Sequence, residues 1–99
     1  MKREEFIEKV NNGENYLALW MVEDEFGKEV KKVKSAQDID YHRWYDIATN
    51  VYECEDGFVG VKGAYNSKSE AQDWSDIGVY CEAFPMKATI KQTTIYTEE

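Results

Sequence analysis

The chain has 99 residues, of which 42% are hydrophobic and 14% aromatic, so it suits one domain spanning residues 1–99 and is too apolar for intrinsic disorder. Twenty acidic residues outweigh twelve basic ones and give a net charge of −8. This field repels phosphate backbones and anionic lipids, which disfavours direct binding to nucleic acid or to a membrane surface and favours basic protein surfaces as partners.

The first predicted element is a short amphipathic helix over residues 2–11. Phe6, Ile7 and Val10 share one helical stripe, and the glutamates between them are left facing water. Asn12-Gly13 supplies a typical helix end, because glycine adopts the left-handed conformation easily. A helix of this length is marginal alone, so we expect it to dock on a sheet.

Two strands are predicted next. The continuous apolar run 16–22 favours a central strand covered on both faces, although a helix remains a weaker alternative for so short a run. Residues 29–34 predict a second strand, whose lysines resemble the charged protection of a sheet edge. Residues 35–40 read as a polar connection.

The middle of the chain predicts a β-hairpin. Residues 41–54 form one alternating strand, Asp56-Gly57 is a favoured hairpin turn, and residues 58–65 return. Gly60 and Gly63 in the return strand indicate a close backbone approach or a bulge that curves the sheet.

Residues 66–78 predict a long polar connection, followed by strands over 79–84 and 88–97 that Pro85 separates. The predicted fold class is therefore α+β, with a short N-terminal helix packed on an antiparallel sheet of about five or six strands.

Catalytic and metal-binding motifs are not evident. Cys54 and Cys81 form no C-x-x-C pattern and are expected to be small core residues, and no spacing links His42 to either thiol. We therefore expect no enzymatic activity, no cofactor and no metal. The start of the chain lacks a secretory apolar region and no run is long enough to span a membrane, so a cytoplasmic protein is expected.

The long polar connection carries its own candidates. Glu70, Asp73 and Asp76 recur every third residue and could gather around a hard cation, but they lack the ligand pattern of a calcium loop. Trp74 lies among them and either packs the connection down or projects toward a partner.

A resemblance follows from segments spread over about half the chain. It is carried by Arg43-Trp44, Val51-Tyr52-Glu53, Asp56-Gly57-Phe58-Val59-Gly60-Val61, Ser69-Glu70, Trp74-Ser75-Asp76-Ile77-Gly78 and Phe84-Pro85-Met86. The chain resembles small acidic proteins encoded by bacteriophages and mobile elements, of the anti-defence type that includes anti-CRISPR inhibitors. The resemblance implies a phage protein acting in the bacterial host, which blocks a basic nucleic-acid-binding surface of a Cas effector complex without catalysis. It assigns no functional residues.

The predicted function is thus a non-enzymatic, nucleic-acid-mimicking inhibitor. Residues 35–83 hold ten acidic residues against three basic ones, and the predicted partner-binding residues come from this region: Glu53, Glu55, Asp56, Glu70, Asp73, Trp74 and Asp76. Two alternatives stay open. One is a phage structural or assembly protein that forms homodimers through an exposed strand such as 88–97. The other is a small hydrolase or a ligand- or metal-binding module that uses the connection 66–78.

Overall fold

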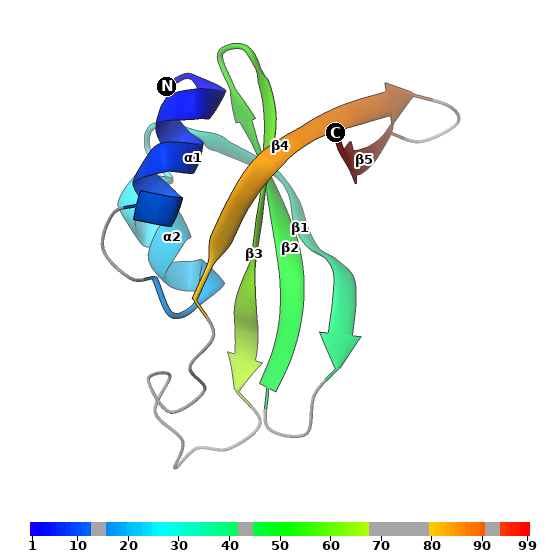
Figure 1. The fold of residues 1–99 in the computed structure, drawn as a ribbon. Helices are drawn as coiled ribbons and strands as arrows, with labels where there is room; N and C mark the ends of the chain where they lie inside the picture. Colours follow the sequence, from blue (N-terminus) through cyan, green and yellow to red (C-terminus); the bar gives the residue numbers. More distant parts are fainter. Residues whose placement is uncertain (13–15, 42–44, 68–79, 91–93) are drawn as a thin grey trace.

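The computed structural model describes residues 1–12, 16–41, 45–67, 80–90 and 94–99. Two helices near the start of the chain precede five strands (Figure 1). In chain order the elements are α1 (Arg3–Asn12), α2 (Leu19–Phe26), β1 (Lys31–Tyr41), β2 (Tyr45–Cys54), β3 (Gly57–Ser67), β4 (Glu82–Ile90) and β5 (Thr94–Glu98). The predicted α+β class, with an N-terminal helix on an antiparallel sheet of about five strands, is confirmed.

The sheet is a simple meander in the order β1-β2-β3-β4-β5, and every pair is antiparallel. The predicted β2–β3 hairpin is confirmed, but its two turn residues are Glu55 and Asp56, one position before the predicted Asp56-Gly57, and Gly57 already pairs with Cys54. Gly57 follows the turn with φ of 145°, a backbone conformation that side chains rarely tolerate. This hairpin brings the middle of the sequence back beside the N-terminus of α1, where Arg3 N donates to Asp56.

The predicted N-terminal helix is confirmed as α1. Phe6 and Val10 are its buried residues, one helical turn apart, and they pack into the core. The Phe6 ring meets Phe26 and Tyr52 edge-on, with ring centroids 5.2 Å and 5.4 Å apart. Both helices contribute to the same core, so they cover one face of the sheet, which we call the helix face.

The strand predicted over residues 16–22 is wrong, because the chain forms α2 there. Leu19, Val22 and Phe26 are buried at helical spacing, whereas Trp20 points outward with 53% of its surface exposed. The last buried residue of α2, Phe26, lies beyond the acidic residues 23–25. The apolar run 16–22 does not include it, so the run alone did not show the helical spacing of the buried residues. A run of seven apolar residues cannot distinguish a buried strand from a buried helix by periodicity.

The connection predicted over residues 35–40 is also wrong, because β1 continues through it to Tyr41. The strand pairs with β2 irregularly, with three register shifts between Lys32 and Asp40. Ala36 and Asp38 have φ of 53° and 52°, the left-handed region that interrupts a regular strand. An irregular strand does not alternate regularly between polar and apolar residues, and for this reason the sequence of the segment resembled a loop.

Pro85 does not separate two strands; it lies inside β4, opposite Val59 of β3. Its carbonyl accepts a hydrogen bond from Glu99 N at 3.3 Å, on the β5 side. Because the N–H and C=O of one strand residue point the same way, the donor that proline lacks would face the end of β5 rather than β3. The predicted strand 88–97 is consequently divided between β4 and β5, which pair with each other.

Both cysteines are buried, free thiols at the helix face, as expected for small core residues. Burial raises the pKa of Cys54 to about 11 and the pKa of Cys81 to about 12. A Cβ atom at Gly63 would collide with the Cys81 sulfur, so this glycine provides the close approach that the sequence indicated.

Candidate functional site

The sheet face opposite the helices, which we call the open face, is where the polar strand residues gather. In β2, Thr49 and Val51 alternate with the core residue Tyr52 and so point away from the helices. Pairing places Thr49 in one row with Lys62 of β3 and Glu82 of β4. The open face is therefore a composite surface to which neighbouring strands each add a side chain.

A glycine shapes the centre of the open face. Gly60 lies opposite Val51 on one side and Phe84 on the other. A Cβ atom at Gly60 would lie 2.8 Å from a Phe84 ring carbon and would also collide with Met86. Both side chains can therefore lie low over β3 only because position 60 has no side chain.

The sheet curls over the open face because its last strand bends back toward its first. The rings of Phe58 and Tyr96 meet across β4 with centroids 5.1 Å apart. Gln37 Nε2 of β1 donates to the Tyr96 carbonyl of β5 at 3.1 Å. The two outer strands of the meander thus come into contact, and the curl leaves a hollow between them.

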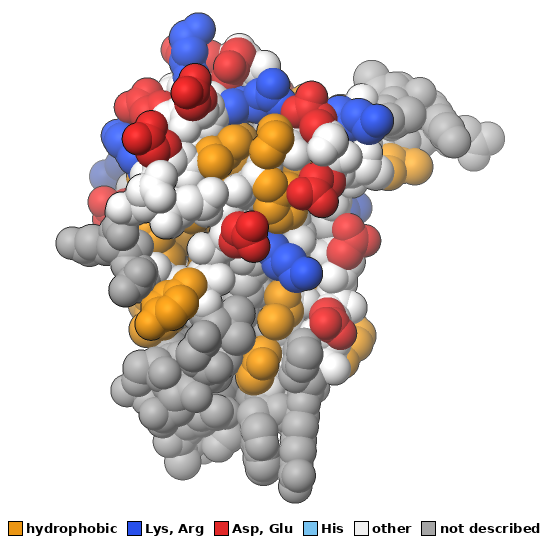
Figure 2. Space-filling view, in the orientation of Figure 1, with side chains coloured by type: hydrophobic (Ala, Val, Ile, Leu, Met, Phe, Trp, Pro, Cys, Tyr) orange, Lys and Arg blue, Asp and Glu red, His pale blue; other side chains and the backbone are white. Residues whose placement is uncertain are grey.

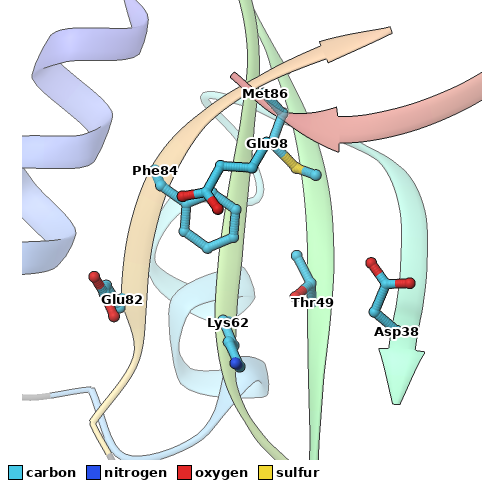
Figure 3. Close-up of a pocket in the computed structure, with 7 residues that line it drawn as sticks. All are labelled: Asp38, Thr49, Lys62, Glu82, Phe84, Met86 and Glu98. Atoms are coloured by element: carbon cyan, nitrogen blue, oxygen red, sulfur yellow. The ribbon is translucent and has the colours of Figure 1, made fainter. Parts of the chain in front are cut away.

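The hollow has a volume of about 310 Å³ and takes side chains from all five strands (Figure 3). They are Asp38, Thr49, Lys62, Glu82, Phe84, Met86 and Glu98. In Figure 3 the Phe84 ring projects from β4 across β3, and Glu98 extends from β5 in the direction of Phe84. The hollow therefore combines apolar, hydroxyl and charged groups within one small volume.

Three carboxylates and one ammonium group line the hollow, so its lining is net negative. Asp38, Glu82 and Glu98 are all exposed, and no ion pair joins them to Lys62 within the described ranges. Figure 2 shows acidic side chains bordering hydrophobic ones on the side of the molecule that faces the viewer. The lining can attract a cation but repels phosphate.

Three of the seven predicted partner-binding residues fall in the described chain. Glu53 is exposed and, by its pairing with Phe58 and the pairing of Phe58 with Met86, shares the open face with Glu98. Glu55 and Asp56 instead lie at the hairpin tip. The other four lie outside the described residues: Glu70, Asp73, Trp74 and Asp76.

The hairpin acids contact the start of the chain. The Asp56 carboxylate accepts a hydrogen bond from Arg3 N at 2.7 Å, at the first turn of α1. That hydrogen bond lowers the pKa of Asp56 below its ordinary value of 3.8. Glu55 lies 3.9 Å from the N-terminal ammonium group of Met1 and is largely exposed. These two acids therefore help to hold α1, a role that the sequence analysis did not anticipate.

Asp38, Glu82 and Glu98 are the acidic residues that sequence reasoning missed. Glu82, Phe84 and Met86 alternate in sequence, which could have placed them on one strand face. The prediction that Pro85 ends a strand hid that signal. Asp38 and Glu98 reach the same hollow only through the curl of the sheet, for which the sequence offers no local pattern.

Among the described residues, no group of three or more histidine, cysteine, aspartate or glutamate side chains is arranged to hold a metal ion. His42 lies outside them. In the same part of the chain, no helix has the length and apolar character needed to cross a membrane. The chain matches no family model, no curated protein and no solved structure.

Proposed function

We propose that the protein is a non-enzymatic inhibitor whose acidic open face occupies a basic, nucleic-acid-binding surface of a host effector complex of the Cas type. The protein would act in the cytoplasm of the bacterial host. It would bind the effector protein directly and compete with DNA or guide RNA for the same lysine- and arginine-rich groove.

The acidic open face is the observation that supports this proposal. Glu53, Glu82 and Glu98 come from three different strands, yet pairing puts them on the face that the helices leave uncovered. They are exposed, as expected of groups that meet a partner, whereas Asp56 is engaged with α1. Carboxylates spread over a surface steer a basic partner into an encounter, and salt weakens that attraction.

Self-assembly through the strand 88–97 is less well supported. Those residues are divided between β4 and β5, which pair with each other. The β1 edge carries three register shifts and two residues with positive φ, features that hinder pairing with another strand. An inhibitor of a basic partner therefore fits the described surface better than a dimer formed by adding strands at the β1 edge.

The test begins with the tagged protein immobilised and exposed to bacterial lysate at low and at high salt, with mass spectrometry of the recovered proteins. We expect a nucleic-acid-binding protein or complex that is retained at low salt and released at high salt. The purified partner, loaded with a labelled DNA duplex or guide RNA, should then lose that nucleic acid as the protein is added. A partner that binds the protein and its nucleic acid simultaneously would contradict the proposal.

A charge-matched pair of variants locates the interacting face. The triple variant Glu53→Lys, Glu82→Lys and Glu98→Lys should abolish displacement of the nucleic acid. The control, Glu8→Lys, Asp24→Lys and Glu25→Lys, makes the same change in net charge with exposed residues of the helices. The control should retain most of the activity. Equal losses in both variants would show that net charge, and not the open face, drives binding.

A further inference from the structure

The deepest polar group of the hollow is the Thr49 side chain. Thr49 is only 6% exposed, and its hydroxyl hydrogen-bonds to none of the described residues. Figure 3 shows this side chain rising from β2 between Lys62 and Asp38, in the hollow that all three line. The hydroxyl is not among the fully buried polar atoms that lack a partner in the described chain, so it opens toward the hollow and can accept a hydrogen bond from a ligand there.

The wall of the hollow is apolar and partly aromatic. Phe84 and Met86 lie over Gly60, and the Phe84 ring projects across β3. An aromatic ring beside carboxylates is a favourable place for a cation, because the ring face is the negative end of its quadrupole. Stacking on such a ring suits a flat cation better than a round one.

The rim supplies acceptors from three different strands. Asp38 belongs to β1, Glu82 to β4 and Glu98 to β5, and in the described chain no three acids converge as ligands of one metal ion. A hard divalent cation needs several oxygens at about 2.0–2.6 Å around one point. A cation with several N–H donors in a plane can instead hydrogen-bond to acceptors that lie apart.

These features together match a guanidinium group, and we propose that the hollow binds an arginine side chain presented by the partner's basic surface. The Phe84 ring stacks on the guanidinium plane, the rim carboxylates accept its N–H groups, and the Thr49 hydroxyl accepts from the donor that reaches deepest. This inference rests on the proposed function, since it names the residue type that the open face recognises.

Lys62 provides an internal test of the sign of the ligand charge. It lies between Thr49 and Glu82 in the row across the sheet and is exposed. Its ammonium group repels an arginine and would attract an anion. Replacing Lys62 with glutamine should therefore strengthen arginine binding, whereas the same change would weaken the binding of phosphate or of a carboxylate.

The experiment uses the full chain, labelled with ¹⁵N, and follows backbone amide shifts as acetyl-Arg-Arg-Arg-amide is added. Amides of Thr49, Lys62 and Phe84 are expected to shift together in a saturable way. The matched peptide with citrulline in place of arginine keeps the planar shape, but a carbonyl oxygen replaces one terminal NH₂ group, so it lacks the charge and part of the donor set and should leave those amides unmoved. Shifts with citrulline equal to those with arginine, or shifts with MgCl₂ but not with arginine, would overturn the proposal.

Variants then assign the contacts. Glu98→Gln should weaken the peptide about two- to fivefold, as expected for an exposed charge pair, and Lys62→Gln should strengthen it about twofold or more. Thr49→Val removes the hydroxyl at nearly constant shape and should weaken binding, while Thr49→Ser should restore it. A Lys62→Gln variant that binds the peptide more weakly, or a Thr49→Val variant that binds it normally, would refute the assignment.

The two proposals fail separately. If the peptide binds the hollow but no basic partner loses nucleic acid to the protein, the inhibitor function is wrong and the arginine site stands. If the Thr49→Val and Glu98→Gln variants displace nucleic acid from the partner as well as the unmodified protein does, the arginine site is wrong and the inhibitor function stands.

Discussion

Docking of α1 onto the sheet depends on Phe6, and shortening that side chain gives a quantitative test of the fold. Phe6 is fully buried and meets two other rings edge-on, Phe26 of α2 and Tyr52 of β2. One side chain thus joins both helices to the second strand. We expect Phe6→Leu to destabilise the protein more than any substitution of similar size on the exposed side of α1.

The magnitude follows from those contacts. Leucine retains most of the apolar area, so the main loss is the two aromatic pairs, each contributing roughly 0.5–1.5 kcal/mol beyond burial. The expected decrease in the free energy of unfolding is therefore about 1–3 kcal/mol. For a domain of this size that corresponds to a melting temperature lower by roughly 4–24 °C. Phe6→Ala, which also opens a cavity, should cost about 3–5 kcal/mol.

Urea denaturation followed by far-ultraviolet circular dichroism and by tryptophan fluorescence measures the loss. The midpoint should fall while the denaturant dependence stays constant, which shows that stability and not compactness has changed. Glu8→Ala, an exposed change on the same helix, is the control and should have little effect. A loss below about 0.5 kcal/mol for Phe6→Leu would refute the packing of α1 described above, because it would lie within the range of ordinary surface substitutions.

Three further predictions concern buried and capping groups. The Tyr52 hydroxyl is buried without a hydrogen bond of ordinary geometry among the described residues. Burial raises the pKa of Tyr52 to about 12, although the nearby Asn50 side chain lowers this pKa somewhat. Because no hydrogen bond is lost, Tyr52→Phe should leave the urea midpoint unchanged or raise it. The pKa of Asp56 is lowered, so its carboxylate stabilises the folded protein above the unfolded pKa of 3.8, and this contribution is lost as pH falls below that value. The free energy of unfolding should therefore decrease less steeply with falling pH in Asp56→Ala than in the unmodified protein. The raised pKa values of Cys54 and Cys81 have the opposite effect on stability. The folded protein keeps both thiols protonated, so the free energy of unfolding should fall as pH rises from about 9 toward 11 and 12. At neutral pH, a thiol reagent should react with them only as fast as the protein unfolds. Rapid labelling of both thiols in the native protein would contradict their burial.

Local patterns explain which elements the sequence could predict. The α1 stripe and the β2–β3 hairpin are determined by residues within one helical turn or one hairpin, and both are confirmed, with the turn one residue earlier than Asp56-Gly57. The apolar run before Glu23 favoured a strand over a helix, but the tertiary packing of Leu19, Val22 and Phe26 decided in favour of the helix. The sequence prediction for Pro85 was wrong because a proline is tolerated inside β4 only where its missing N–H faces the end of β5. That position is a property of the neighbouring strand and not of the residues around Pro85.

The candidate site shows the same limit more sharply. Sequence reasoning grouped acids that are close in the chain, and it predicted that Glu55 and Asp56 bind a partner. In the structure both of these acids contact the start of the chain beside α1. Of the three acids that share the hollow, Asp38 is far from Glu82 and Glu98 in the chain. No spacing in the sequence encodes their proximity.

What joins those distant acids is a small set of contacts that bend the sheet. Gly60 lets Phe84 and Met86 lie low, and the contacts of Tyr96 with Phe58 and Gln37 draw β5 back toward β1. The same bend that closes the sheet on itself therefore concentrates carboxylates on the open face. An acidic chain needs only dispersed charge to remain in solution, whereas the arginine site that we propose needs carboxylates, the Phe84 ring and the Thr49 hydroxyl around one hollow. This difference is the physical reason for seeking the partner through the open face rather than through net charge.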